Sequence, residues 1–206
     1  LLRMSGLSFH KPDPFDKRRD DAAVEARIEE VRAEVAPLVG DPAWKVYAAD
    51  EVRLDQEADI RRAWIPIGRK AKVKVDRRRQ AQSYIGFLDQ DSGRCVLERL
   101  PWQNGEEILA ALERLAARDP GKRICVVWDN AAWHKTKIIR EQLAKGGSLE
   151  RVHLVALPPY APDHNPIEHV WKAAKDHSAN IQQTDFDDTL AKFEAYTASR
   201  AFNYRI

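Results

Sequence analysis

The chain has 206 residues, of which 44% are hydrophobic and 32% are charged, and its formal net charge is +2. This is enough for one sizeable domain with a buried core and a smaller appendage, and the net charge by itself points to no class of partner. No signal peptide and no apolar run of about 18 residues is present, so we expect a soluble intracellular protein. Cys95 and Cys125 lie 30 residues apart, a spacing that supports neither a disulfide framework nor a zinc site.

The N-terminal part is expected to be the end of a longer protein, because the chain begins with Leu1 instead of Met. Glycine and prolines within residues 1–15 indicate the tail of a preceding element and a linker. An amphipathic helix is predicted from about residue 20 to residue 35, because apolar side chains recur there at helical spacing. Whether this helix packs on the core or forms a dimer interface is left open by the sequence.

Strands dominate the next part of the chain. The first strand is predicted at residues 44–49 and delivers Asp50 at its end. Short further strands are predicted at 63–67 and in the alternating KVKV pattern at 73–75, and a hairpin at 83–88 and 94–100. The coarse expectation is three antiparallel strands in succession.

Helices and strands alternate in the second half. Asn104 and Glu107 form a capping-box pattern at the start of a helix over 105–117. A buried strand over 123–128 delivers Asp129 at its end, and a helix at 135–144, a strand at 154–157, a helix from Pro166 and a last helix at 185–201 follow. The order predicts an α/β domain with a mixed sheet, and no glycine-rich nucleotide fingerprint is present.

A proline-rich connection follows the strand at 154–157. Pro158 and Pro159 stop that strand because proline cannot donate to a sheet ladder. Asn165 is suited to cap a helix that begins with Pro166, which places Glu168 in the first helical turn. A solvated glutamate favoured by the helix dipole is the alternative interpretation of this position.

Three acids therefore occupy comparable positions: Asp50, Asp129 and Glu168 each stand at the carboxyl end of a predicted strand or just after it. If these strands are neighbours, their carboxylates converge, and either their pKa values rise or a cation fills the site. Oxygen ligands suit Mg²⁺ or Mn²⁺, and two such ions about 3.5–4 Å apart could hold both oxygens of a phosphoryl transfer. Separate turn and capping roles remain the alternative for each acid.

Positive charge is concentrated in one segment. Residues 61–79 contain nine basic residues and one acid, which leaves 25 of the 34 basic and 31 of the 32 acidic residues for the rest of the chain. This asymmetry indicates a strip that faces a polyanion. A charged, solvated hairpin is the alternative.

Two motifs, WDNAAWHK (128–135) and LPPYAPDHNPIEHVWKAAK (157–175), resemble the catalytic core of DDE transposases of the mariner superfamily, especially its bacterial insertion-sequence branch. The phrase AADEVRL around Asp50 is similar to the first acidic motif of that family. The resemblance implies a ribonuclease-H-like fold over residues 41–206, following the helix at 20–40 and a remnant of a helix-turn-helix module at 1–19. It also implies metal-dependent DNA cleavage and strand transfer in the bacterial cytoplasm, at the nucleoid.

By this resemblance Asp50, Asp129 and Glu168 are the catalytic residues and bind two Mg²⁺ or Mn²⁺ ions. Asn130, His134 and Asn165 lie beside them in the motifs. The implied partners are DNA, as element ends and target, and a second copy of the chain; no nucleotide cofactor and no membrane is expected. The residues expected to contact DNA are Arg69, Lys70, Lys72, Lys74, Arg77, Arg78, Arg79, Lys172 and Lys175.

Two related functions stay open. One is a nuclease of the same fold without strand transfer, and the other is a transposase-derived DNA-binding protein with an inactive site. A zinc hydrolase would use His134, His164 and His169, but no HExxH or comparable spacing is present. Trp171 is expected to pack its helix against the sheet.

Overall fold

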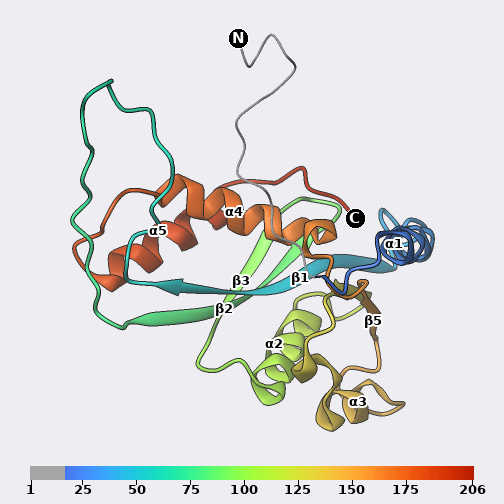
Figure 1. Cartoon of the computed structure of the whole chain (residues 1–206). Helices are drawn as coiled ribbons and strands as arrows, with labels where there is room; N and C mark the ends of the chain where they lie inside the picture. The colour runs from blue at the N-terminus through green and yellow to red at the C-terminus, as the bar shows by residue number, and fades with distance from the viewer. Residues whose placement is uncertain (1–16) are drawn as a thin grey trace.

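The computed structural model describes residues 17–206, and a five-stranded sheet lies at its centre (Figure 1). The strands are β1 (Trp44–Asp55), β2 (Ala81–Asp89), β3 (Cys95–Leu100), β4 (Arg123–Trp128) and β5 (Val152–Ala156), in the spatial order β3-β2-β1-β4-β5. β1 pairs antiparallel with β2, and β2 with β3, whereas the pairs β1–β4 and β4–β5 are parallel. The predicted mixed sheet, antiparallel first and then parallel, is confirmed.

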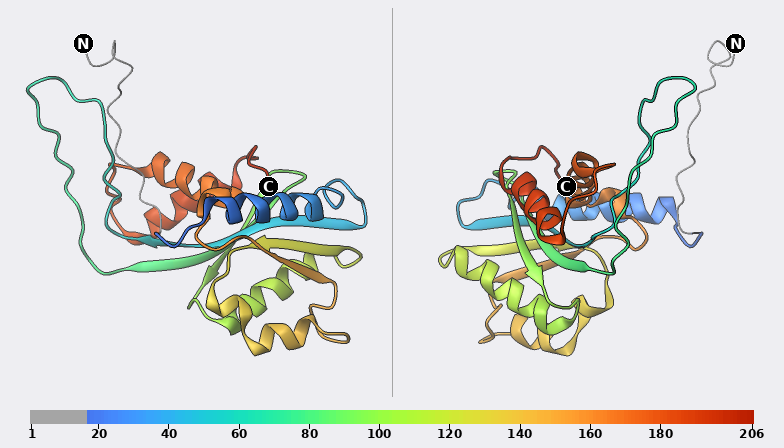
Figure 2. Two further views of the ribbon diagram at one scale, coloured as in Figure 1. Left: turned by 45° about the vertical axis from the view of Figure 1, so that its right-hand side comes forward. Right: turned by 90° about the vertical axis from the view of Figure 1, so that its left-hand side faces the viewer.

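Helices cover both faces of this sheet (Figure 2). They are α1 (Asp21–Val35), α2 (Gly105–Arg118), α3 (Lys137–Leu143), α4 (Pro166–Ser178) and α5 (Phe186–Ala198), with short 3₁₀ turns η2 (Ala132–Lys135) and η3 (Pro162–His164). Side chains alternate between the two faces along β1. Tyr47 and Ala49 therefore pack with α2, and Ala48 and Val52 pack with α4 and α5.

α1 belongs to the core. Asp20 caps it by accepting hydrogen bonds from the backbone N–H groups of Ala22 and Ala23. Its four buried side chains pack on the α4 side of the sheet against residues of β1, β4 and β5; they are Val24, Ile28, Val31 and Val35. One of the two roles that the sequence left open, packing on the core, is therefore observed.

The strands predicted at 63–67 and 73–75 are wrong. Residues 56–80 have no regular secondary structure and form a long projection between β1 and β2, here called the basic arm (Figures 1 and 2). Trp64 and Ile67 are fully exposed on it. Alternation of apolar and polar residues makes a strand only where one face is buried, and the arm has no layer to cover such a face.

Of two further predictions, one differs from the structure and the other falls almost entirely outside the described residues. The helix predicted at 135–144 is divided, because Thr136 adopts an extended conformation between η2 and α3. The expected helix-turn-helix remnant at 1–19 lies outside the described residues except for its last three. Within residues 17–206, no helix combines the length and apolar character needed to cross a membrane.

Candidate active site

Asp50 lies in the middle of β1, so the predicted end of the first strand at Ala49 is wrong. β1 pairs with β4 as far as Ala48 and then continues beside β2 alone to Asp55. Val52 and Leu54 bury their side chains in this continuation and explain its stability. Asp50 still follows the last parallel pair by two residues. It therefore stands at the carboxyl edge of the parallel part of the sheet, where α/β sheets bind ligands.

Trp171 of α4 fixes the side chain of Asp50. Its indole Nε1 donates a hydrogen bond to Asp50 Oδ2 at 3.0 Å. The ring reaches this position because the residue opposite Asp50 on β2 is Gly86: a Cβ there would lie 2.3 Å from Trp171 Cη2. Trp171 is buried, as expected for a residue that packs its helix on the sheet, and it also orients a predicted site residue.

Asp129 immediately follows β4 and is held through one carboxylate oxygen. Asp129 Oδ1 accepts a hydrogen bond from the backbone N–H of Ala131 at 2.9 Å. The same oxygen lies 3.1 Å from Nδ1 of His134, an imidazole that stacks on Trp128 with ring centroids 3.9 Å apart. No hydrogen bond to Asp129 Oδ2 is found within residues 17–206.

Two asparagines join the segments that carry the acids. Asn130 donates its amide N–H to the carbonyl of Leu157, at the start of the proline-rich loop. Asn165 donates to the carbonyl of Ala49 at 2.9 Å and accepts from the N–H of Ile167 as the cap of α4. The predicted positions of Asn130 and Asn165 beside the acids are therefore linking positions, which tie β4 to the loop and α4 to β1.

The three acids line one cavity. A cavity of about 440 Å³ is bordered by Asp50, Asp129 and Glu168, with the loop from residue 157 to residue 162 as its wall. Glu168 lies in the first turn of α4, as predicted. Tyr160, on the wall, has a positive φ of 60°, a conformation that only a few per cent of non-glycine residues adopt. The structure thus brings together all three residues that the sequence predicted.

Electrostatic repulsion is built into this cavity. Burial raises the pKa of Asp50, and the negative charges of Glu168, Glu51 and Asp129 raise it further. Burial also raises the pKa of Glu168, although the positive charge of Lys175 acts against this. Asp129 differs, because its bonds from His134 and Ala131 outweigh burial and lower its pKa. A cation in the cavity would relieve the repulsion.

The donor set suits a hard divalent cation. Carboxylate oxygens are the ligands that Mg²⁺ and Mn²⁺ prefer, and Mg²⁺ is usually bound through one or two carboxylates with water and phosphate oxygens completing its shell. Among residues 17–206 no three His, Cys, Asp or Glu side chains are already arranged around one point. Each ion would therefore take few protein ligands.

Comparison with known families decides the classification. A family model described as DDE superfamily endonuclease matches residues 45–191. The chain belongs to the DDE endonuclease superfamily. The matched region begins at β1 and ends within α5, so it contains all three acids of the cavity.

Solved structures agree with this DDE classification. The Mos1 transposase paired-end complex with the left transposon end matches with a TM-score of 0.69 and 16% identity, over 97% of this chain and 61% of that chain. The catalytic domain of Mos1 mariner transposase matches with a TM-score of 0.55 and 15% identity, over 93% and 86%. At these identities the likeness shows the fold, and the predicted ribonuclease-H-like fold is confirmed.

One curated relative matches part of the DDE chain. It is an uncharacterized protein, y4pE/y4sA, of Sinorhizobium fredii (strain NBRC 101917 / NGR234), with 31% identity over 86 residues. The match covers 41% of this chain and 57% of the relative.

The residues expected to contact DNA fall into two groups. Lys172 and Lys175 lie on α4, where Lys172 pairs with Asp176 at 2.9 Å. The remaining seven lie on the basic arm, where Arg77 pairs with Glu57 and Arg78 with Asp76. No ion pair to another described residue is found for the other five, which are Arg69, Lys70, Lys72, Lys74 and Arg79.

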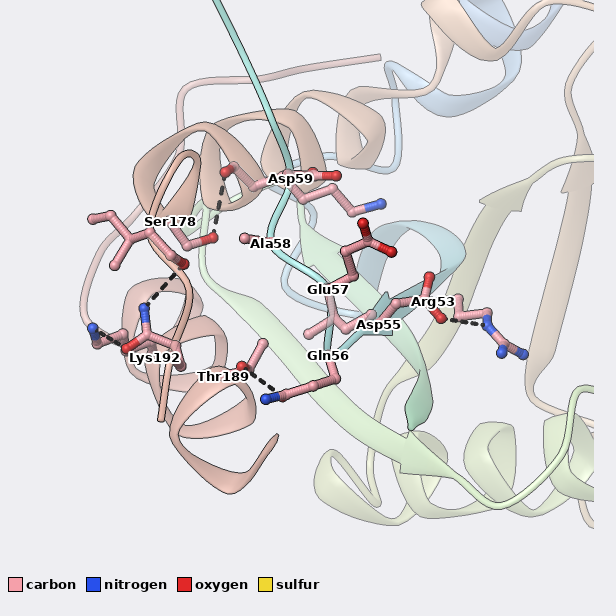
Figure 3. A pocket seen from close by; sticks show the side chains of 13 residues that line it. Arg53, Asp55, Gln56, Glu57, Ala58, Asp59, Ser178, Thr189 and Lys192 are labelled. Atoms are coloured by element: carbon pink, nitrogen blue, oxygen red, sulfur yellow. Dashed lines mark hydrogen bonds and ion pairs between the residues drawn. The ribbon is translucent and has the colours of Figure 1, made fainter. Parts of the chain in front are cut away.

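A second cavity lies at the base of the basic arm (Figure 3). It has a volume of about 360 Å³ and is lined by residues 53–59 together with Lys175, Thr189 and Lys192. Gln182 closes the base of the arm: its Oε1 accepts from the backbone N–H groups of Ala58 and Asp76, at 3.1 and 2.8 Å. One side chain thus holds both ends of the arm.

Sequence reasoning missed the roles of Glu51 and Gln182 and gave Trp171 a packing role only. Glu51 is buried beneath His134, Trp171 bonds to Asp50, and Gln182 bridges the arm. The motif AADEVRL contained a usable signal for Glu51. Adjacent residues in a strand point to opposite faces of the sheet, so an acid next to Asp50 has to be accommodated on the other face. No local pattern points to Gln182.

Proposed function

We propose that this chain is the catalytic domain of a DDE transposase, which cleaves DNA and transfers the cut strand with the help of two Mg²⁺ or Mn²⁺ ions. The observation that carries the proposal is the single cavity lined by Asp50, Asp129 and Glu168. In support, Mos1 structures of the same fold are described as complexes with Mg and with Mn. Residues 41–206 would form the catalytic domain, with residues 1–19 as the end of a helix-turn-helix module.

The roles of the residues follow from their positions. When bound, the ions would act as Lewis acids on the attacking and leaving oxygens of an in-line phosphoryl transfer. Asp50, Asp129 and Glu168 would hold them, and no nucleophilic side chain is needed. Trp171 orients Asp50 and His134 orients Asp129, so two of the carboxylates are positioned before any ion binds.

DNA would approach along the positively charged side of the site. Lys175, whose charge lowers the pKa of Glu168, lies between the acidic cavity and the cavity at the base of the arm. The basic arm continues from there with its arginines and lysines. Such residues bind phosphates without reading sequence, so recognition of element ends is assigned to an N-terminal part outside the catalytic domain or to a partner.

Assembly and location follow from the same proposal. Pairing of two element ends requires two active sites, so we propose that the chain acts as a homodimer. The chain spans 61% of the Mos1 transposase chain, and the match to the curated relative covers 57% of that relative. With DNA as its substrate, the enzyme would act in the bacterial cytoplasm, at the nucleoid.

Nicking of supercoiled plasmid with Mg²⁺ or Mn²⁺ tests the proposal. Wild type is expected to nick, and Asp129→Asn to lose nicking, because the substitution removes a ligand charge but keeps the oxygen that accepts from His134. Asp187→Asn, an exposed acid in the first turn of α5, is the matched control and should nick like wild type. Equal nicking by wild type and Asp129→Asn would contradict the mechanism. Nicking without joining of a labelled 3′ end to plasmid would favour the nuclease alternative.

A further inference from the structure

Glu51 is a buried acid for which the proposed chemistry has no use. It follows Asp50 in β1 and therefore faces the opposite side of the sheet, towards η2. Its side chain is only 5% exposed. Glu51 Oε1 lies 2.8 Å from Nε2 of His134 and accepts a second bond, at 3.3 Å, from the indole N–H of Trp133. A buried carboxylate is costly unless it is paired, so the contact with His134 compensates for the burial of Glu51.

His134 connects Glu51 to Asp129. The imidazole is 1% exposed, and each of its two nitrogens faces a carboxylate: Nε2 faces Glu51 Oε1 and Nδ1 faces Asp129 Oδ1 at 3.1 Å. Nδ1 also lies 3.3 Å from the backbone carbonyl oxygen of Asp129. The ring plane is fixed as well, since it stacks on Trp128 with an interplanar angle of 1°. The imidazole thus has one orientation available.

Asp129 is the end of this chain of contacts. Its side chain is 52% exposed and would rotate freely without a partner. Its Oδ1 accepts the N–H of Ala131 at 2.9 Å and lies 3.1 Å from Nδ1 of His134. Oδ2 is left without a bond from the described residues, in a side chain that lines the acidic cavity. Holding one oxygen fixes where the other is presented.

We propose that Glu51 is a positioning residue for the metal site: it holds the imidazole of His134 in place against Asp129 Oδ1, so that Oδ2 is presented to a divalent ion. This inference rests on the proposed function, since it assumes that Asp129 binds the ion. Residues that orient metal ligands typically change metal affinity by 10- to 100-fold when they are replaced. Glu51 and Asp50, neighbours in β1, would thus serve the same site from opposite faces of the sheet.

The direct test is calorimetric titration of the full chain with MnCl₂ alone. Glu51→Ala is expected to weaken Mn²⁺ binding by about tenfold. Glu51→Gln keeps an oxygen that accepts from His134 and should restore part of the affinity. His134→Asn places an amide N–H near the position of Nδ1 and should retain more affinity than His134→Ala. Nicking rates should follow the same order.

Asp89→Asn is the matched control. Asp89 is another buried acid in an ion pair, with Lys45 at 2.8 Å, but it does not line the acidic cavity. Its replacement should lower stability and leave Mn²⁺ affinity unchanged. Folding of each variant is checked by circular dichroism, and Glu51→Gln keeps the test valid if Glu51→Ala fails to fold.

The outcomes separate this inference from the proposed function. Mn²⁺ binding that Asp129→Asn abolishes but Glu51→Ala and Glu51→Gln leave unchanged would overturn the role of Glu51 alone. If the Glu51 variants are less stable but bind Mn²⁺ with unchanged affinity, Glu51 has a structural role only, and this inference is overturned. Absence of Mn²⁺ binding by wild type would overturn the proposed function and this inference with it.

Discussion

The indole N–H of Trp171 bonds to Asp50 Oδ2 at 3.0 Å, across 121 positions of sequence. This bond links α4, which carries Glu168, to β1, which carries Asp50. It also lowers the pKa of Asp50, although burial and the nearby negative charges raise that pKa overall. The geometry of two of the three acids thus depends on one aromatic side chain that holds helix and sheet together.

Trp171→Phe should reduce nicking by about tenfold, because a hydrogen bond to a carboxylate is removed while most of the ring packing remains. Plasmid nicking under single-turnover conditions measures the effect. Phe193→Leu is the matched control, since Phe193 packs on Trp171 with ring centroids 5.9 Å apart but makes no contact with Asp50. Stability should fall in both variants, and a tenfold loss of nicking in Phe193→Leu would contradict a specific role for the indole N–H.

Gly86→Ala should destabilise the fold by about 1–3 kcal/mol, the usual cost of overpacking. The added methyl would meet the Trp171 ring at 2.3 and 2.7 Å. Urea denaturation followed by tryptophan fluorescence measures the change. At Gly121 an added Cβ has nothing within 4 Å, so Gly121→Ala should be neutral or slightly stabilising. Equal stability of the two variants would show that Trp171 moves aside without cost.

Asp89→Asn should lower stability at pH 7 by about 2 kcal/mol, the range for hydrogen bonds to charged groups. Burial raises the pKa of Asp89, but bonds from Lys45 and from the N–H groups of Ser92 and Asp91 outweigh it and lower the pKa overall. A carboxyl group whose pKa is lower in the folded than in the unfolded state stabilises the fold at pH values above its unfolded pKa, which is about 3.9 for Asp. This stabilisation is lost as the pH falls through the folded-state pKa.

The difference in the free energy of unfolding between wild type and Asp89→Asn should therefore become smaller as the pH is lowered from 7 towards 3. Urea titrations at a series of pH values measure this difference. Asp55→Asn is the control, because Asp55 is 61% exposed in its pair with Arg53. An exposed pair contributes little, so this variant should stay within about 0.5 kcal/mol of wild type at every pH. A constant difference across pH for Asp89→Asn would exclude an electrostatic origin.

Replacement of Arg77, Arg78 and Arg79 by Ala should weaken DNA binding equally on all sequences. Each phosphate that is no longer neutralised lowers the slope of log K against log salt by about 0.9, so the slope should fall by up to about 2.7. Fluorescence anisotropy with duplexes of different sequence measures both quantities. Replacement of Lys137, Arg140 and Lys145, exposed residues on α3 and just after it, is the charge-matched control. A sequence-selective loss would show that the arm reads bases.

Gln182→Ala should release the basic arm from the body of the protein. The side chain accepts from Ala58 and Asp76 and donates to the carbonyl of Gln56 at 2.9 Å, so its removal takes away the contact that joins the two ends of the arm to the body. Trypsin cleavage within residues 61–79 should become several-fold faster, with little change in melting temperature. Gln183→Ala, at the neighbouring position, is the control. Unchanged cleavage would mean that the arm is held elsewhere.

The elements that depend on local sequence patterns were predicted correctly, whereas those that depend on pairing with distant segments were not. Periodicity located α1, α2, β4 and β5, and the caps at Asn104 and Asn165 are those that the sequence predicted. The strands at 63–67 and 73–75 failed because alternation alone does not supply a layer to pack against. Asp50 was placed at a strand end because the strand's continuation beside β2 depends on a pairing that no local pattern contains.

By itself, the sequence determined the order of the main helices and strands outside residues 56–80, the candidate acids, the proline-rich loop before Glu168 and the superfamily. Each of these depends on residues near one another in the chain, where spacing and residue type are sufficient. Only the tertiary structure decided that Trp171 holds Asp50, that Glu51 supports His134 from behind the sheet, and that Gln182 spans the base of the arm. These contacts join residues 83 to 124 positions apart or bridge separate segments, and they arise from packing rather than from local periodicity.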